Sequence, residues 1–152
     1  MSEQMAFTVH SASEAGMLTS HRTQAGVLLT DEPPAMGGSG QAPNPIEMLL
    51  AAWSGCLVAT ARMVAREHGV NLGGITATVE GSIDPRRVQG DRTAPAGLCS
   101  AQAVLRVSVA DPLPWLAADV ESRCPVSGVI GASGADIQIS IEHADPAEAL
   151  FR

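Results

Sequence analysis

The sequence predicts a single α+β domain over residues 1–152, in which antiparallel strands surround one long, buried helix. The length of 152 residues is the common size of one domain. A run of roughly 24 residues from Pro45 to His68 is apolar on nearly every side, while the segments before and after it alternate as strands do. With two Phe and no Tyr, the core must be aliphatic.

The charge of the chain argues against nucleic acid as a partner. The formal net charge is −7 at pH 7, and no cluster of Lys or Arg overrides it locally. The first ten residues, MSEQMAFTVH, contain neither a basic segment nor an apolar segment of a signal peptide. We therefore expect a cytoplasmic protein.

The first thirty residues read as a short antiparallel meander. Weak alternation marks three strand segments, at 5–10, 17–21 and 26–30, with small turn residues between them. Residues 31–43 hold three prolines and three glycines, which disfavour both a helix and a ladder strand. This segment is predicted to be a flexible loop.

The long helix has a clear start and stop. Asn44 can cap it, Pro45 suits the first helical position, and Glu47 can close a capping box. Gly69 after His68 is the natural left-handed end.

This helix needs more cover than one small chain provides. Residues 48–65 lack the polar stripe of a surface helix, so protein or lipid must surround them. A membrane span needs about 20 apolar residues, and here Arg62 and other polar residues interrupt a barely sufficient run. We therefore expect no membrane insertion and an intertwined homodimer instead.

The second half of the chain predicts three more strands and two more helical segments. The strands are expected at 75–83, 100–110 and 136–141, the first helix at 112–123 with Asp111 as its cap, and a short turn or helix from Cys124 to about Gly131. A charged turn at 84–92 joins the first two of these strands.

The chain has three cysteines, Cys56, Cys99 and Cys124, without CxxC spacing. Cys56 on the buried helix is either a small hydrophobe or a reactive thiol. Cys124 follows Arg123 at a helix junction, where a cation and free N–H groups could lower a thiol pKa. Cys99 is expected to be a packed small residue. The histidines share no metal-ligand spacing with each other or with the cysteines, so no metal site is predicted.

Two motifs together resemble the OsmC/Ohr family of osmotically inducible and organic hydroperoxide resistance proteins. They are APNPIEMLLAAWSGC, which ends at Cys56, and RCPVS, which contains Cys124. The resemblance implies a dimeric OsmC-like fold and a two-cysteine peroxidase without a cofactor. In such an enzyme the Cys56 thiolate attacks an organic hydroperoxide, Cys124 condenses with the sulfenic acid to a disulfide, and a dithiol such as dihydrolipoamide regenerates both thiols.

The resemblance also implies a cation that stabilises the thiolate. Family members use an arginine from the N-terminal strands, held by a glutamate that directly follows Asn-Pro, and Ile46 stands at that position here. Arg22 is the best candidate for the arginine, with His21 as its alternative. Glu47 is the nearest acid, and it serves either as the catalytic carboxylate or only in the capping box.

Two non-catalytic functions compete with the peroxidase. The chain could bind an apolar ligand in a dimer pocket, or it could be a redox sensor whose Cys56–Cys124 disulfide alters a partner surface.

Overall fold

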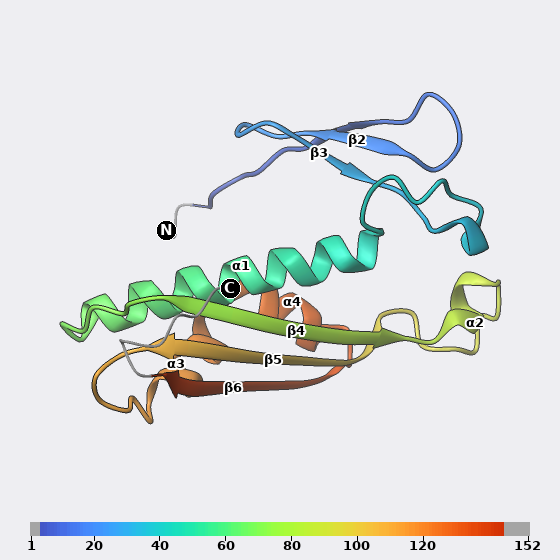
Figure 1. Cartoon of the computed structure of the whole chain (residues 1–152). Coiled ribbons are helices and arrows are strands. Elements are labelled where there is room, and N and C mark those ends of the chain that lie inside the picture. The colour runs from blue at the N-terminus through green and yellow to red at the C-terminus, as the bar shows by residue number, and fades with distance from the viewer. Residues whose placement is uncertain (1–3, 145–152) are drawn as a thin grey trace. The chain divides into compact units, whose positions relative to one another are not determined.

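The computed structural model describes residues 4–144 (Figure 1). These residues form helices as well as two three-stranded sheets, which confirms the predicted α+β class. The chain divides into two units, residues 1–49 and 50–152, and each is described by itself. The prediction that residues 1–152 form a single domain stays a prediction.

The first unit contains the predicted antiparallel meander. Strands β1 (His10–Ala12), β2 (Thr19–Arg22) and β3 (Val27–Thr30) pair in that order. The first strand begins at His10 rather than Met5, because His10 already pairs with Arg22, the last residue of β2. The chain turns directly after Arg22, so residues 5–9 have no neighbouring strand in this sheet.

The Pro/Gly segment after β3 is ordered by one buried carboxylate, which the sequence did not predict. Asp31 is 1% exposed and accepts hydrogen bonds from the backbone N–H groups of Glu32, Ser39 and Gln41 and from the Ser39 hydroxyl, the last at 2.6 Å. A Cβ on Gly38 would lie 1.8 Å from the Glu32 carbonyl oxygen, so only glycine fits there. The segment also contains the 3₁₀ turn η1 (Pro34–Met36).

These hydrogen bonds predict a pH-dependent stability. The Ser39 hydroxyl, opposed by burial and helped by the three N–H groups, lowers the pKa of Asp31 below its usual value. The contribution of Asp31 is therefore present above about pH 4, where the carboxyl of the unfolded chain is ionised, and is lost as the pH falls through the lower folded pKa. Urea unfolding should show Asp31→Asn less stable than wild type at pH 7, with the gap closing in acid.

Glu14 provides the matched control, since Glu14→Gln removes a carboxylate that is exposed to solvent. It should leave the stability close to that of wild type at both pH values. If Asp31→Asn lowers the stability by the same amount at neutral and acidic pH, the stabilising role of ionised Asp31 is contradicted.

The second unit is a sheet with helices against it (Figure 1). Its strands are β4 (Ile75–Ile83), β5 (Leu98–Ser108) and β6 (Asp136–Ala144), with β5 in the centre, antiparallel to β4 and parallel to β6. Its helices are α1 (Pro45–Glu67), whose first turn belongs to the first unit, α2 (Pro85–Val88), α3 (Leu116–Arg123) and α4 (Pro125–Ala132).

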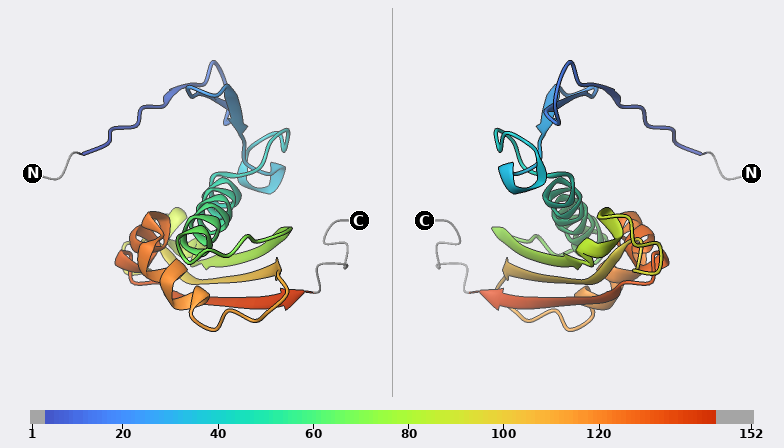
Figure 2. Two further views of the ribbon diagram at one scale, coloured as in Figure 1. Left: turned by 90° about the vertical axis from the view of Figure 1, so that its left-hand side faces the viewer. Right: turned by 90° about the vertical axis from the view of Figure 1, so that its right-hand side faces the viewer.

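Helices α1 and α4 pack on the same face of this sheet (Figure 2). A Cβ on Gly81 would lie 3.0 Å from Leu50 of α1, and a Cβ on Gly131 of α4 would lie 3.5 Å from Ile137. Gly81 and Ile137 flank the same residue of β5, Ala101, which is fully buried. This face carries the core, and small residues let the helix backbones approach it.

Helix α1 begins with the predicted capping box. The Asn44 N–H donates to Glu47 Oε2 and the Glu47 N–H donates to Asn44 Oδ1, both at 2.8 Å. Gly69 follows the helix with φ of 72°, the left-handed conformation expected at its end. By length and composition α1 could cross a membrane, a test that core helices of soluble proteins also pass.

The expectation that every side of α1 is buried is not met within the chain. One side is buried and consists of Trp53, Leu57, Thr60, Ala61, Val64 and Ala65. The other side is exposed and carries small residues, among them Ala51, Gly55 and Ala59, together with the larger Arg62 and Met63. Within residues 4–144, the rest of the chain therefore covers about one side of the helix.

The prediction of a helix from Pro112 with Asp111 as its cap is wrong. Helix α3 begins only at Leu116, and Trp115 occupies the cap position. Pro114 is the physical reason, because a proline disfavours the helical conformation of the residue before it, here Leu113. The charged turn after β4 holds a helical turn that was missed, α2, which Asp84 caps by accepting from the Arg86 N–H.

Candidate active site

The second unit brings two cysteines together that are 68 residues apart in the sequence. The sulfur of Cys56 on α1 lies 3.1 Å from the sulfur of Cys124 between α3 and α4, and both are free thiols. Cys124 is 3% exposed, whereas Cys56 is half-buried and so more accessible to a small molecule. Cys99 lies on β5 and is exposed, which corrects the expectation that it is packed.

Two contacts fasten α3 to the end of α1 and so place Cys124. The Arg123 guanidinium binds the Glu67 carboxylate through both of its terminal nitrogens, at 2.5 and 2.9 Å. The His68 ring stacks on Trp115 just before α3, with the centroids 4.2 Å apart. Cys124 follows α3 directly, leaves the helical conformation and serves as the cap residue of α4.

The Cys56 thiol is in a setting that opposes its ionisation. Burial is the main cause that raises the pKa of Cys56, and the neighbouring Cys124 raises it further. The Val126 N–H and the Thr60 hydroxyl, one turn along α1, donate hydrogen bonds that offset this only in part. Cys56 therefore needs help to become a nucleophile at neutral pH.

The Cys124 thiol is in the opposite setting. Burial acts to raise the pKa of Cys124, but hydrogen bonds from the Ser127 hydroxyl, the N–H groups of Ser127 and Val126, and Cys56 together lower it. The predicted effect of free N–H groups is thus present. The Arg123 guanidinium is held by Glu67 and is not among the main causes of the lowered pKa of Cys124.

Ser127 connects the sulfur pair to the buried side of α1. Its hydroxyl oxygen lies 2.8 Å from the indole nitrogen of Trp53, and both side chains are buried. Sequence reasoning missed this link and the Glu67–Arg123 pair. For Ser127 a signal existed, since it is the third residue after the cap of α4, a position from which the backbone N–H points back at the cap.

The other candidate residues belong to the first unit. Arg22 is exposed on β2. Both ring nitrogens of His21 are engaged within the sheet, by the hydroxyls of Ser11 and Thr30, each at 2.8 Å. Glu47 closes the capping box with Asn44. The roles of Arg22 and Glu47 at Cys56 stay predictions.

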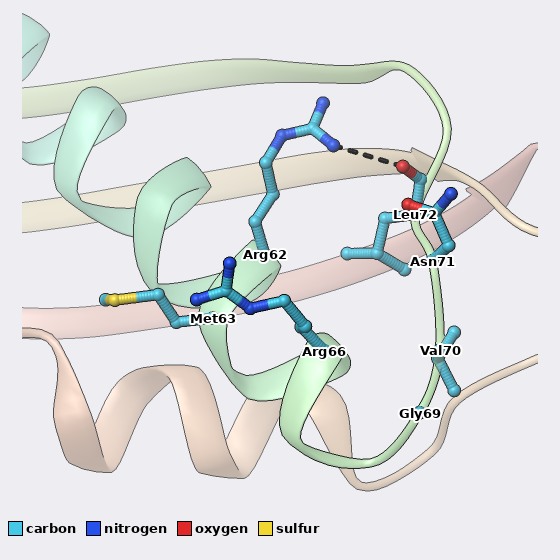
Figure 3. Close-up of a pocket in the computed structure, with 7 residues that line it drawn as sticks. All are labelled: Arg62, Met63, Arg66, Gly69, Val70, Asn71 and Leu72. Carbon is cyan, nitrogen blue, oxygen red and sulfur yellow. Dashed lines mark hydrogen bonds between the residues drawn. The ribbon is translucent and has the colours of Figure 1, made fainter.

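A hollow of about 460 Å³ at the C-terminal end of α1 contains neither cysteine of the pair (Figure 3). Arg62 spans part of it and donates to the carbonyl oxygens of Leu72 and Gly73, each at 3.0 Å. Arg62 thereby fastens the connection between α1 and β4. Among residues 4–144, no group of three or more His, Cys, Asp or Glu side chains could hold a metal ion.

Comparison with known proteins identifies the family. The family of OsmC-like proteins matches residues 38–140, which include both cysteine motifs. The chain belongs to the OsmC-like family. A search of curated proteins finds no significant match.

Solved structures of OsmC-like proteins share the fold. An OsmC-like protein of Mycoplasma pneumoniae has a TM-score of 0.76 at 16% identity, with 93% of this chain and 99% of that chain covered. An organic hydroperoxide resistance protein of Legionella pneumophila has a TM-score of 0.65 at 21% identity, covering 91% and 99%. An organic hydroperoxide resistance protein of Elizabethkingia anophelis has a TM-score of 0.63 at 15% identity, with 93% of this chain and 100% of that chain covered.

Proposed function

We propose that this OsmC-like protein is a thiol-dependent peroxidase that reduces organic hydroperoxides. The observation that carries the proposal is the contact of two free thiols at 3.1 Å, one half-buried and one buried. Cys56 attacks the peroxide, releases an alcohol and becomes a sulfenic acid. Cys124 then forms a disulfide with Cys56 and releases water. A dithiol of the dihydrolipoamide type reduces the disulfide in the cytoplasm.

The surroundings of the pair support an organic substrate. Cys56 lies on a helix whose neighbouring residues are apolar or small, among them Leu57 and Ala59. Such a wall favours a peroxide with an apolar group over hydrogen peroxide. Two similar structures are organic hydroperoxide resistance proteins. Arg22, with Glu47 as its carboxylate partner, is proposed as the cation at Cys56.

A turnover assay with cumene hydroperoxide and dihydrolipoamide tests the proposal. Wild type should consume many equivalents of peroxide per chain, and Cys56→Ser should fall to the uncatalysed background. Cys99→Ser is the matched control and should keep full activity, because Cys99 lies outside the pair. If oxidation stops after one equivalent of peroxide although excess dithiol is present, a redox sensor is favoured. If Cys56 is not oxidised at all, a protein that binds an apolar ligand is favoured.

We also propose that the working form is a homodimer. The exposed side of α1 includes Gly55, Ala59 and Met63, and the first sheet exposes Val27 and Leu28 to solvent at 60% and 49%. A second copy of the chain would bury this apolar surface.

Sedimentation equilibrium checks the dimer. At micromolar concentration the protein should sediment as a dimer, without a stable folded monomer. Ala59→Glu places a charge on the exposed side of α1 and should dissociate or unfold the protein. Ser140→Glu, on an exposed position of β6, should leave the dimer intact. A compact wild-type monomer that unfolds cooperatively would refute the homodimer.

A further inference from the structure

The hollow at the C-terminal end of α1 has the size of a site for a small organic molecule. Its volume is about 460 Å³, within the range of roughly 300–1,000 Å³ that is usual for ligand pockets. Part of its wall is apolar and consists of Met63, Val70 and Leu72 (Figure 3). This part of the wall suits a ligand with an apolar body.

The polar part of the hollow is positively charged. Arg62 and Arg66 line the hollow, and within residues 4–144 no Asp or Glu side chain does. The chain as a whole has the opposite balance, with 16 Asp and Glu against 9 Lys and Arg. Two arginines four residues apart on a helix are neighbours that repel each other. An anion bound between them would remove this repulsion.

The backbone holds the Arg62 guanidinium at one side of the hollow. Its two terminal nitrogens donate to the carbonyl oxygens of Leu72 and Gly73, each at 3.0 Å. A guanidinium has five N–H groups, so three remain for another acceptor. The two carbonyl oxygens accept hydrogen bonds but leave the positive charge without a counter-charge. Arg62 is therefore a donor that is already oriented before a ligand binds.

Arg66 is the second donor. It extends back along α1 on the side of Met63 (Figure 3), and among residues 4–144 no carboxylate forms an ion pair with it. The adjacent acid, Glu67, is bound by Arg123, which is the largest cause of the lowered pKa of Glu67, whereas Arg66 is the smallest. The dipole of α1 favours a cation in its last turn, which explains a positive charge at this position but not the missing acidic partner.

A carboxylate is the anionic group that best matches these donors. Guanidinium groups bind carboxylates through two parallel N–H···O bonds. The Asn71 side chain also lines the hollow, and its amide can donate a further hydrogen bond to the same ligand. The apolar wall adds contacts for an alkyl or aryl group, which an inorganic anion lacks.

We propose that this hollow binds a small organic carboxylate, whose head group bridges Arg62 and Arg66 and whose apolar body contacts Met63 and Val70. This site goes beyond the proposed peroxidase function and does not include the Cys56–Cys124 pair. The bound carboxylate connects α1 to residues 69–73, the chain segment that leads into β4.

The proposed homodimer affects the same region, because Met63 also lies on the exposed side of α1. Cover by a second copy would remove water from Arg62 and Arg66, and two charges without a counter-charge cost more when they are desolvated. A carboxylate side chain of the second copy is the competing source of the anion. One Asp or Glu side chain fills only a fraction of the 460 Å³, so we assign the site to a small molecule.

Isothermal titration calorimetry with octanoate tests the site in reduced wild-type protein, without any peroxide. Octanoate should bind at one site per chain with a Kd on the order of 1 mM. Octanamide has the same tail without the charge and should bind about tenfold more weakly. Equal affinities for octanoate and octanamide would overturn the proposal. Inorganic phosphate that binds as tightly as octanoate would overturn the assignment to an organic carboxylate.

Arg66→Met should weaken octanoate binding about tenfold and leave octanamide binding unchanged, because only the charged ligand loses a partner. Arg66 is replaced rather than Arg62, since Arg62 also fastens residues 72 and 73. Arg92→Met is the matched control, because it removes an exposed arginine outside the hollow, and it should keep the wild-type affinity. Unchanged octanoate binding in folded Arg66→Met would overturn the site.

Hydrogen exchange of the wild-type protein locates the ligand without any variant. Octanoate should slow the exchange of backbone N–H groups in residues 69–73, because the bound carboxylate restrains this segment against α1. Slowing that is confined to other segments would overturn the assignment to this hollow.

Sedimentation of wild type and Arg66→Met distinguishes the small molecule from the second copy. If octanoate does not bind and Arg66→Met weakens the dimer, the anion is a carboxylate of the second copy and the proposal fails. An unchanged dimer together with weakened octanoate binding supports the small-molecule site. Loss of peroxidase activity has no bearing on these measurements, so the two proposals fail separately.

Discussion

One equivalent of an organic hydroperoxide should convert Cys56 and Cys124 into an intrachain disulfide and leave Cys99 reduced. The two sulfurs are already in contact at 3.1 Å, and a sulfenic acid beside a thiol condenses rapidly. Cys99 is exposed on β5 and is not part of the pair. Peptide mass spectrometry after blocking free thiols identifies which cysteines are joined.

The two single variants separate the roles of the cysteines. Cys124→Ser should stop at the Cys56 sulfenic acid and pass to the sulfinic acid under excess peroxide, because no thiol is left to trap it. Cys56→Ser should leave the peroxide unconsumed. Oxidation of Cys99 or Cys124 while Cys56 stays reduced would refute the peroxidase mechanism, and an intermolecular disulfide would refute the intrachain pairing.

Local signals made much of the second unit predictable. The predicted bounds of the helix from Pro45 agree with α1 to within one residue at its end. The reason is local, because Asn44 and Glu47 cap its start and Gly69 ends it. Strand β4 was correct at both ends, since its alternation is bounded by glycines and by Asp84. The start of α3 was misplaced because an apparent Asp-Pro start outweighed the second proline, Pro114.

Nonlocal packing decided what the sequence could not predict. The order in the Pro/Gly segment depends on Asp31, whose four hydrogen bonds come from residues up to ten positions away. The relation of Cys124 to Ser127 and Trp53 depends on α4 packing beside α1, and 74 residues separate the two hydrogen-bonded side chains. The cysteine pairing itself was expected only from the family resemblance.

Replacing Leu57 by Ala should cause the largest loss of stability among the predicted single substitutions. Leu57 is fully buried on α1, directly after Cys56. Removing a buried leucine side chain leaves a cavity and costs about 2–5 kcal/mol of unfolding free energy. Urea denaturation at one fixed protein concentration measures this, because association shifts the apparent stability.

Val129 on α4 is the matched control for this loss. Its side chain is 70% exposed, so Val129→Ala should change the unfolding free energy by less than about 1 kcal/mol. Because Leu57 also supports the turn of α1 that carries Cys56, Leu57→Ala should slow disulfide formation by peroxide even where the protein remains folded. Equal stability of the two variants would mean that the buried side of α1 does not carry the core, and the packing that places Cys56 against Cys124 would need another explanation.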